Sequence, residues 1–187
     1  MSVNPQAPPL ATPWVPLWPL ASPTPPRLRL PVRLRVPRSS TLAANATFNV
    51  TALTAHDIAV WEFVNNVEGR VYGYVLLPVT VAANPAAELR LLTASAAASG
   101  NTRWRVATKG VADGQSLNPA ALTAEAYQNV PSGGAWVMKE VTFALTEPLL
   151  PRGILLVEVT RDGGNALDTA EGIAYLIEAY LEVNLGA

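Results

Sequence analysis

Three glutamates near the C-terminus are the side chains whose type and spacing could do hydrolytic chemistry. Glu158, Glu178 and Glu182 lie in two apolar stretches that we expect to form neighbouring strands. Two carboxylates that flank a glycosidic bond can act as the acid and the base or nucleophile of a glycosidase. Acidic residues on the solvent face of a strand are far more often solvated or paired with arginine, and we favour that interpretation.

A glycine-rich loop between the two stretches carries potential oxygen ligands. Asp162, Asn165 and Asp168 could together bind Ca²⁺, although the loop lacks the fuller EF-hand pattern. Asp and Asn are also ordinary turn residues, and we favour turn formation. The chain has no Cys and one His, His56, so a zinc site or a His-based triad would rest on a single residue. We expect neither a metal nor a cofactor.

The common catalytic motifs are missing from the sequence. It contains no phosphate-binding Gly-x-x-x-x-Gly-Lys-Ser/Thr loop and no dinucleotide-binding Gly-x-Gly-x-x-Gly. It also lacks the Gly-x-Ser-x-Gly nucleophile elbow and the His-Glu-x-x-His zinc motif. The sequence therefore predicts a protein that is not an enzyme.

The elements that must position these residues begin with residues 153–185, which we predict to be one long β-hairpin. Its first half is β-branched and apolar, and residues 161–165 have turn chemistry. A helix competes for the second half, because Asp168 and Glu171 have capping-box spacing and some apolar residues fit a 3.6-residue period. Alternation favours a strand that turns one apolar set toward the core: Ile173, Tyr175, Ile177, Ala179, Leu181, Val183 and Leu185.

Three motifs in this part of the chain are similar to a known family. They are Arg-Asp-Gly-Gly-Asn-Ala-Leu-Asp-Thr at 161–169, Val-Ala-Asp-Gly-Gln-Ser-Leu-Asn at 111–118 and Thr-Arg-Trp-Arg-Val at 102–106. They resemble tailed-bacteriophage virion structural proteins with a jelly-roll or β-sandwich domain, of the capsid decoration (cement) type. The resemblance covers about residues 58–187 and implies a fold and a place in a virion, but no catalytic residues.

The whole sequence predicts an all-β protein: a jelly-roll-like antiparallel β-sandwich with an extended, proline-rich N-terminal arm. We expect the arm at residues 1–38, a linker at 39–57 and the sandwich at 58–187, where short strand signals alternate with Gly, Asn and Pro turns. Alternation around Trp104 places this side chain in the core. Residues 118–130 permit a short helix or a strand.

The arm is defined by its prolines and its charge. Residues 1–26 contain nine of the 17 prolines, so extended polyproline-like chain is expected, and at ~3.1 Å per residue the arm spans roughly 120 Å. Residues 1–38 carry five of the 13 basic residues and none of the 14 acidic ones. Such a basic arm suits the acidic surface of a sister subunit.

Two groups of arm residues are predicted to bind a partner. One group forms an aromatic anchor for a partner subunit, and packing on the chain's own body is the alternative. The apolar side chains of the other group alternate with arginines along a half-buried strand, which Pro31 and Pro37 confine to a sheet edge of this domain or of a neighbour. We expect the arginines to face carboxylates, and a nucleic-acid role is disfavoured because no aromatics interleave with them. The predicted contact residues are Trp14, Leu17, Trp18, Leu20, Arg27, Leu28, Arg29, Leu30, Arg33, Leu34 and Arg35.

The resemblance, together with the reach of the arm, implies a capsid decoration protein on the capsid surface of the virion. It implies a homotrimer that binds itself and the major capsid protein or other virion subunits. No nucleic-acid partner is expected. No membrane partner is expected either, since the longest apolar stretches are too short to span a bilayer. The alternatives are a tail or baseplate component and a glycan-binding jelly-roll module. For the glycan-binding module, the candidate stacking platforms are Trp61, Tyr72, Tyr74 and Trp136.

Overall fold

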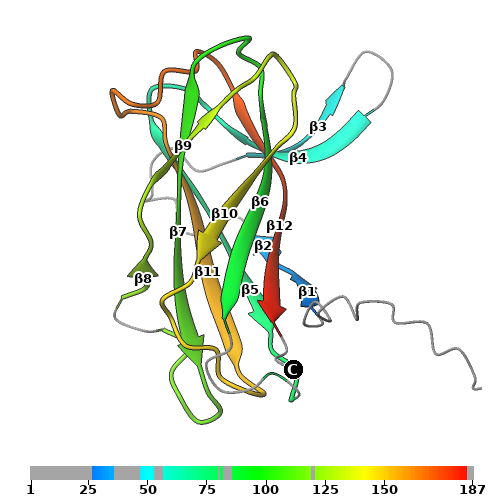
Figure 1. Cartoon of the computed structure of the whole chain (residues 1–187), viewed down its shortest axis with the longest axis vertical. Coiled ribbons are helices and arrows are strands. Elements are labelled where there is room, and N and C mark those ends of the chain that lie inside the picture. Colours follow the sequence, from blue (N-terminus) through cyan, green and yellow to red (C-terminus); the bar gives the residue numbers. More distant parts are fainter. Residues whose placement is uncertain are drawn as a thin grey trace, which may run out of the picture.

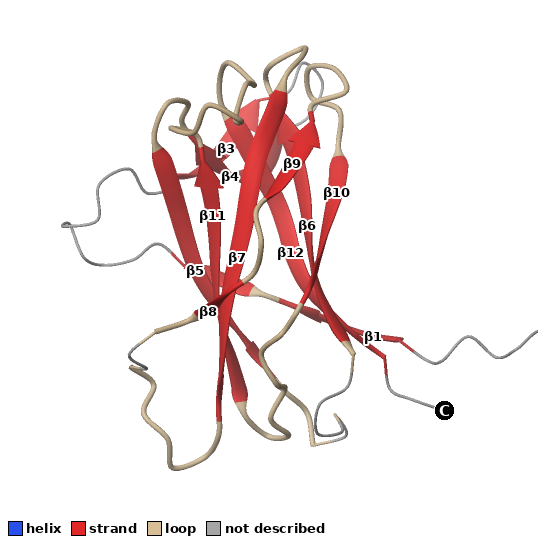
Figure 2. Ribbon diagram, turned by 60° about the vertical axis from the view of Figure 1, so that its left-hand side comes forward, coloured by secondary structure: helices blue, strands red, loops and turns tan. Residues whose placement is uncertain are grey.

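The computed structural model describes residues 27–35, 47–52, 57–79, 81, 86–118 and 121–184. These residues form twelve strands and no helix, in two facing layers (Figures 1 and 2). Every strand pair among them is antiparallel. The predicted all-β, jelly-roll-like sandwich is confirmed.

The first layer, sheet A, has the strand order β10-β6-β12-β4-β3, and β1 also pairs with β12. Its strands are β1 (Arg27–Pro31), β3 (Thr47–Ala52), β4 (Asp57–Phe63), β6 (Ala87–Ser95), β10 (Lys139–Ala144) and β12 (Ala174–Asn184).

The second layer, sheet B, has the order β2-β5-β11-β7-β8, and β9 also pairs with β7. Its strands are β2 (Arg33–Arg35), β5 (Glu68–Leu76), β7 (Asn101–Val111), β8 (Thr123–Ala124), β9 (Gln128–Pro131) and β11 (Ile154–Asp162).

The core lies between the sheets and is filled by the inward half of each alternating strand. Trp104 of β7 and Phe63 of β4 are both fully buried and meet edge to face, with ring centroids 5.0 Å apart. Leu89 of β6 and Leu155 of β11 belong to the same buried cluster. The predicted core position of Trp104 is confirmed, and its contact with Phe63 joins the two layers.

The prediction of one C-terminal hairpin is wrong, although both of its halves are strands. β11 pairs with β5 and β7 in sheet B, whereas β12 pairs with β4, β6 and β1 in sheet A. The loop between them therefore crosses from one layer to the other. Alternation shows that one face of a strand is buried, but it does not show which sheet the strand joins.

The crossing loop is organised around the side chain of Arg161, which is fully buried at the end of β11. Its Nε and Nη2 donate to the two carboxylate oxygens of Asp168 at 3.0 and 2.8 Å. The guanidinium also donates to the carbonyl oxygens of Phe63, Ala170 and Gly172 at 2.9–3.1 Å. One cation thus ties the loop to β4 of the opposite sheet.

A β-bulge divides β12. The pairing of β12 with β6 shifts register between Leu176 and Glu178. Before the shift Leu176 points into the core, and after it Ala179 and Leu181 do. The predicted apolar set of this strand is therefore split, because an extra residue in a strand moves the following side chains to the other face.

Strands also form in two segments for which the sequence predicted either a helix or a strand, or a linker. Within residues 118–130, for which helix and strand were both predicted possibilities, the structure has β8 and β9 on the edge of β7, and the Glu125 N–H donates to the Val106 carbonyl at 2.9 Å. β3 lies within residues 39–57, the predicted linker. Residues 27–35, the end of the predicted arm, pair with the sandwich.

We predict that Arg161→Ala lowers the free energy of unfolding by about 3–5 kcal/mol, because it leaves the Asp168 carboxylate buried without its counter-charge. Urea denaturation measures this loss. The double variant Arg161→Ala/Asp168→Ala should lose less than the sum of the single variants, since the two side chains form one unit. Arg35→Ala, at an exposed position of β2, is the control and should change stability by less than about 0.5 kcal/mol. Additive losses would contradict the proposed coupling.

Candidate functional site

The described part of the arm, residues 27–35, is the first candidate site, and we call it the arm root. β1 pairs with β12 from Arg27 opposite Asn184 to Pro31 opposite Tyr180. At Val32 the chain leaves sheet A, and β2 then pairs with β5 of sheet B. Val32 is 8% exposed and its N–H donates to the Ala179 carbonyl at 2.9 Å. The arm root therefore joins both sheets as an edge strand of each, and the predicted edge position is confirmed.

A glycine in β5 lets the arm root lie close to sheet B. A Cβ atom on Gly73 would lie 2.9 Å from the Arg33 carbonyl oxygen and 2.9 Å from Val32 Cγ1. Any larger residue there would push β2 away from β5. Close backbone approach is a common reason for glycine inside a strand.

The arginines of β1 face carboxylates, as predicted. Arg27 Nη1 and Arg29 Nε donate to the carboxylate of Glu182, Arg29 at 3.0 Å. Arg90 Nη2 lies 3.2 Å from the same carboxylate, whose side chain is 2% exposed. Burial alone would raise the pKa of Glu182, but the hydrogen bonds from Arg27 and Arg29 and the charge of Arg90 lower it overall.

Besides Arg27 and Arg29, which bind Glu182, the predicted partner residues divide into three groups. Leu28, Leu30 and Leu34 are half-buried and pack against the core of their own chain. Arg33 and Arg35 are exposed on β2. The aromatic anchor residues lie outside the described residues: Trp14, Leu17, Trp18 and Leu20.

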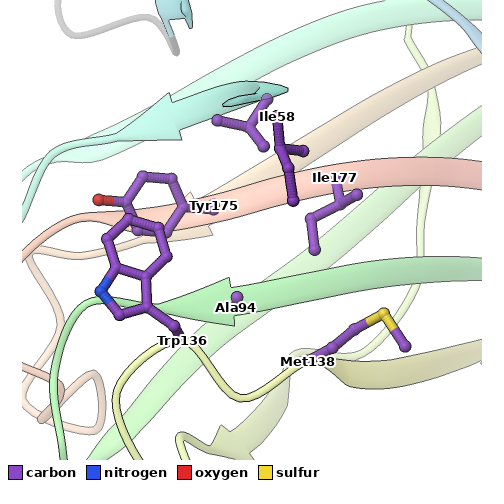
Figure 3. A pocket seen from close by; sticks show the side chains of 7 residues that line it. Ile58, Ala94, Trp136, Met138, Tyr175 and Ile177 are labelled. Atoms are coloured by element: carbon purple, nitrogen blue, oxygen red, sulfur yellow. The ribbon is translucent and has the colours of Figure 1, made fainter. Parts of the chain in front are cut away.

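The second candidate site is an apolar pocket on the outer face of sheet A. It has a volume of about 220 Å³. Its side chains come from β4, β6, β12 and the segment before β10, and converge on one hollow (Figure 3). None of them is charged, and Met138 is 60% exposed. The lining residues are Ile58, Val60, Ala94, Trp136, Met138, Tyr175 and Ile177.

Trp136 forms one wall of the pocket in a backbone conformation that is rare for its type. Its φ is 65°, and its N–H donates to the Ser95 carbonyl at 2.7 Å. Left-handed backbone costs a residue with a Cβ roughly 1–2 kcal/mol. The indole stacks on the Tyr175 ring at 4.5 Å between centroids while remaining 42% exposed. The turn thus keeps the indole stacked on Tyr175 and partly exposed to solvent.

The pocket follows from the bulge in β12. Tyr175 and Ile177 belong to the alternating apolar set that the sequence assigns to the core. Tyr175, before the register shift, and Ile177, at the shift, both line the outer pocket instead. Residues 133–134 supplied a turn signal before Trp136, which was expected in a strand and lies in a turn instead. The sequence shows the apolar residues of the pocket, but it carries no mark of the bulge that brings them together.

The other predicted stacking platforms lie elsewhere. Trp61 is 8% exposed and belongs to the core cluster. Tyr72 and Tyr74 alternate with the buried Val71 and Val75, so they lie on the outer face of sheet B. Of the four candidates, Trp136 lines the apolar pocket.

A more polar groove lies beside the apolar pocket and shares Met138 with it. Glu140 accepts a hydrogen bond from the Tyr180 hydroxyl at 2.7 Å, and Arg29 lies over the Tyr180 ring at 5.0 Å. The lining residues are Arg29, Pro31, Leu92, Met138, Glu140, Glu178 and Tyr180. The outer face of sheet A is therefore apolar at one end and charged at the other.

The carboxylates considered for hydrolysis do not come together as expected. Glu158 lies on the outer face of sheet B, with Arg70 and Arg105 at 3.7 and 3.8 Å, whereas Glu178 and Glu182 both lie on β12 of sheet A. Glu158 therefore faces the opposite side of the sandwich from the other two. Their expected adjacency depended on the hairpin, which does not form.

The oxygen-rich loop is a turn whose side chains bind protein groups. Asp168 accepts from Arg161, and Asp162 lies 3.2 Å from Arg103 Nε. The Asn165 side-chain oxygen accepts from the Leu167 N–H at 3.0 Å, so the turn interpretation is confirmed. Within the described ranges no cluster of three or more His, Asp or Glu side chains is placed to hold a metal. The same ranges contain no helix long and apolar enough for a bilayer.

We predict that Glu182→Gln lowers the free energy of unfolding by about 1–3 kcal/mol at pH 7, because three arginines at the arm root lose their shared counter-charge. The folded-state pKa of Glu182 is lowered, so its contribution is complete above the unfolded value of about 4.3 and is lost as pH falls through the folded value. The stability difference between native protein and variant should therefore shrink in acid. Denaturation over pH 3–8 measures it.

Glu178→Gln, at an exposed position of the same strand, is the matched control and should stay within about 0.5 kcal/mol of the native protein at every pH. A difference for Glu182→Gln that is constant from pH 3 to 8 would show that the ion pairs do not hold β1 on β12.

No protein-family model and no curated protein matches the chain. Among solved structures, it is similar to CBM35 from Cellvibrio japonicus Abf62, with 17% identity, coverage of 83% of this chain and 92% of that one, and a TM-score of 0.44. It is also similar to the C-terminal CBM6 of LamC, a laminarinase from Zobellia galactanivorans. The identity is 11%, the match covers 84% of this chain and 99% of that one, and the TM-score is 0.43. A third similar structure is the enzymatically active domain of tailspike protein 4 from bacteriophage CBA120. The identity is 9%, the match covers 81% of this chain and 19% of that one, and the TM-score is 0.41.

Proposed function

We propose that this chain is a non-catalytic structural protein of a bacteriophage virion: a capsid decoration (cement) protein, acting as a homotrimer. In this role the distal arm, residues 1–26, binds neighbouring copies or the major capsid protein. The observation that carries the proposal is the arm root, which is paired with both sheets of the sandwich. The sequence resemblance to virion structural proteins agrees with it.

An arm that holds a shell together must transmit tension to its own domain. β1 lies antiparallel to β12 over five residues, so a pull on the distal arm along the β1 axis acts on all of their hydrogen bonds together. Val32 and β2 add backbone bonds to both sheets, and Glu182 holds the two arginines of β1. These contacts support a role as a mechanical link.

The acidic side chains support a structural role over a catalytic one. Glu147 accepts from the Gly110 N–H and the Thr123 hydroxyl, and Lys109 lies 3.0 Å away. Glu182 and Asp168 are buried against arginines. A general acid needs a raised pKa, whereas the pKa values of Glu140, Glu147 and Glu182 are lowered.

We predict that deletion of residues 1–26 leaves the fold intact and abolishes binding to capsids. The cut falls before Arg27 because a longer deletion would remove β1 and β2 from the sheets and leave Glu182 buried without two of its arginines. Co-sedimentation with undecorated capsids measures binding, and heat-induced release of DNA measures protection. Removal of residues 1–12, which keeps both arm tryptophans, is the matched control and should bind like the full chain.

Two outcomes would overturn the proposal. The first is normal capsid binding and heat protection by the protein that lacks residues 1–26. The second is detection of the protein, by labelling on purified particles, at the tail or baseplate alone, which would favour the tail alternative.

A glycan-binding module is the second candidate function. The observation in its favour is the exposed indole of Trp136 beside a groove with polar side chains, because sugar-binding sites combine an aromatic platform with hydrogen-bonding groups. A glycan array on the full chain and on Trp136→Ala tests it. Binding that the substitution removes would support this function, and the absence of any bound glycan would reject it.

A further inference from the structure

We propose that the apolar pocket on sheet A is the receptor for residues 13–20 of a second copy of this chain. The inference rests on the proposed function and deepens it, by naming the surface that the distal arm binds. Three observations support it: the chemistry of the pocket, the period of the arm sequence and the direction in which the chain enters β1.

The pocket and the arm are matched in polarity. None of the seven lining residues is charged, and residues 1–26 contain no charged side chain. The pocket's volume, about 220 Å³, is below the ~300–1,000 Å³ typical of small-molecule sites, and suits one or two anchoring side chains. Polyproline helices bind grooves lined by aromatic side chains, and the Trp136–Tyr175 stack forms such a wall.

The sequence of residues 13–20, Pro-Trp-Val-Pro-Leu-Trp-Pro-Leu, has a three-residue period. Prolines stand at 13, 16 and 19, and large apolar residues at 14, 17 and 20. A polyproline helix has three residues per turn, so Trp14, Leu17 and Leu20 fall on one edge of it. The arm therefore offers a continuous apolar edge, with Trp18 beside it, to a receptor of the pocket's kind.

The chain's direction favours a second copy over the chain's own pocket. Arg27 pairs with Asn184 at one end of β12, whereas Tyr175 and Ile177 lie seven or more residues away toward the other end. At ~3.3 Å per residue the separation is roughly 23–30 Å. β1 runs from Arg27 toward the pocket end, so an extended chain continuing on the same line before Arg27 would lead away from the pocket.

The residues just before Arg27 oppose a reversal. Prolines occupy positions 23, 25 and 26, and a residue that precedes a proline is restricted to extended conformations. To fill its own pocket, the arm would have to turn back at this point. A polyproline-like chain that continued outward would place Trp14, thirteen residues before Arg27, about 40 Å away and within reach of a neighbouring subunit.

Exchange of this kind gives each copy one arm to donate and one pocket to fill. Such a contact joins two different surfaces, and it closes into a ring when the rotation between copies permits. A ring of three matches the proposed homotrimer. The predicted occupant of each pocket is thus the arm of the next subunit.

Two variants that each keep one half of the contact test the proposal. The chain without residues 1–26 keeps the pocket, and the full chain with Ile58→Glu/Met138→Glu keeps the arm. We expect the full native chain to associate in sedimentation velocity experiments, each variant alone to be monomeric, and their mixture to form a mixed complex. Ile58 and Met138 are 37% and 60% exposed, so the substitutions place charge in the pocket without burying it in the core.

Single substitutions provide the quantitative comparison. Met138→Glu and, separately, Trp14→Ala should weaken association about tenfold or more, because each removes apolar contact from the anchor site. Leu117→Glu is the matched control: it makes the same change in charge at a residue that is 64% exposed and outside the pocket, and should leave association unchanged. Circular dichroism confirms that each variant is folded.

A native chain that stays monomeric, or a Met138→Glu variant that associates as the native chain does, would overturn the proposal. A monomeric chain in which Trp14→Ala shifts the NMR signals of Tyr175 would show that the arm fills its own pocket, and it would also overturn the second-copy assignment. These failures are separable from failure of the proposed function. If deletion of residues 1–26 still abolishes capsid binding while Met138→Glu has no effect, the arm has its role but binds a different surface.

Discussion

The guanidinium of Arg161 is the contact on which the arrangement of the two sheets depends most. It is fully buried and donates to one carboxylate and three backbone carbonyls that belong to β4 and to the loop between β11 and β12. A buried charge is costly unless paired, so the loop conformation that brings Asp168 onto Arg161 is strongly favoured. That conformation carries the chain from sheet B to sheet A. The hydrogen bonds of this cation help to hold the C-terminal strand in sheet A, where it also pairs with β6, β4 and β1.

From this crossing follow the two features that we connect with function. β12 becomes the central strand of sheet A, and its C-terminal half offers an edge to β1 while its N-terminal half pairs with β4. The bulge between these halves turns Ala179, Leu181 and Val183 inward but leaves Tyr175 and Ile177 outward. The same strand thus holds the arm root at one end and one wall of the apolar pocket at the other. Distance along β12 separates the place where the arm leaves from the place where we infer that an arm is received.

Strand identity and core membership could be predicted from the sequence, because alternation directly reflects burial of one face. Residues 154–160, Trp104 and the Arg-Leu pattern of residues 27–35 were assigned correctly as strand, core and edge. Sheet partners could not be predicted in the same way. The glycine-rich residues after Arg161 look like a hairpin turn, and their role depends on Asp168 and on the Phe63 carbonyl, 98 positions earlier in the chain. Such long-range hydrogen bonds leave no local pattern.

The apolar pocket could not be predicted from the sequence for a different reason. Its residues were visible, since Trp136 was noted as a stacking platform and Tyr175 and Ile177 as part of an apolar set, but the set was assigned to the core. One extra residue in β12 reverses the facing of that set, and no residue type at the bulge announces it. A strained φ at Trp136 then brings an indole from the adjoining turn onto Tyr175. Backbone strain at an exposed aromatic residue persists only where the surrounding structure imposes it, and here the Ser95 carbonyl does so. The exposed aromatic wall is therefore a fixed feature of the fold, formed before any partner binds. A preformed wall lowers the entropic cost of binding on the receptor side, just as closely spaced prolines lower it on the side of the arm.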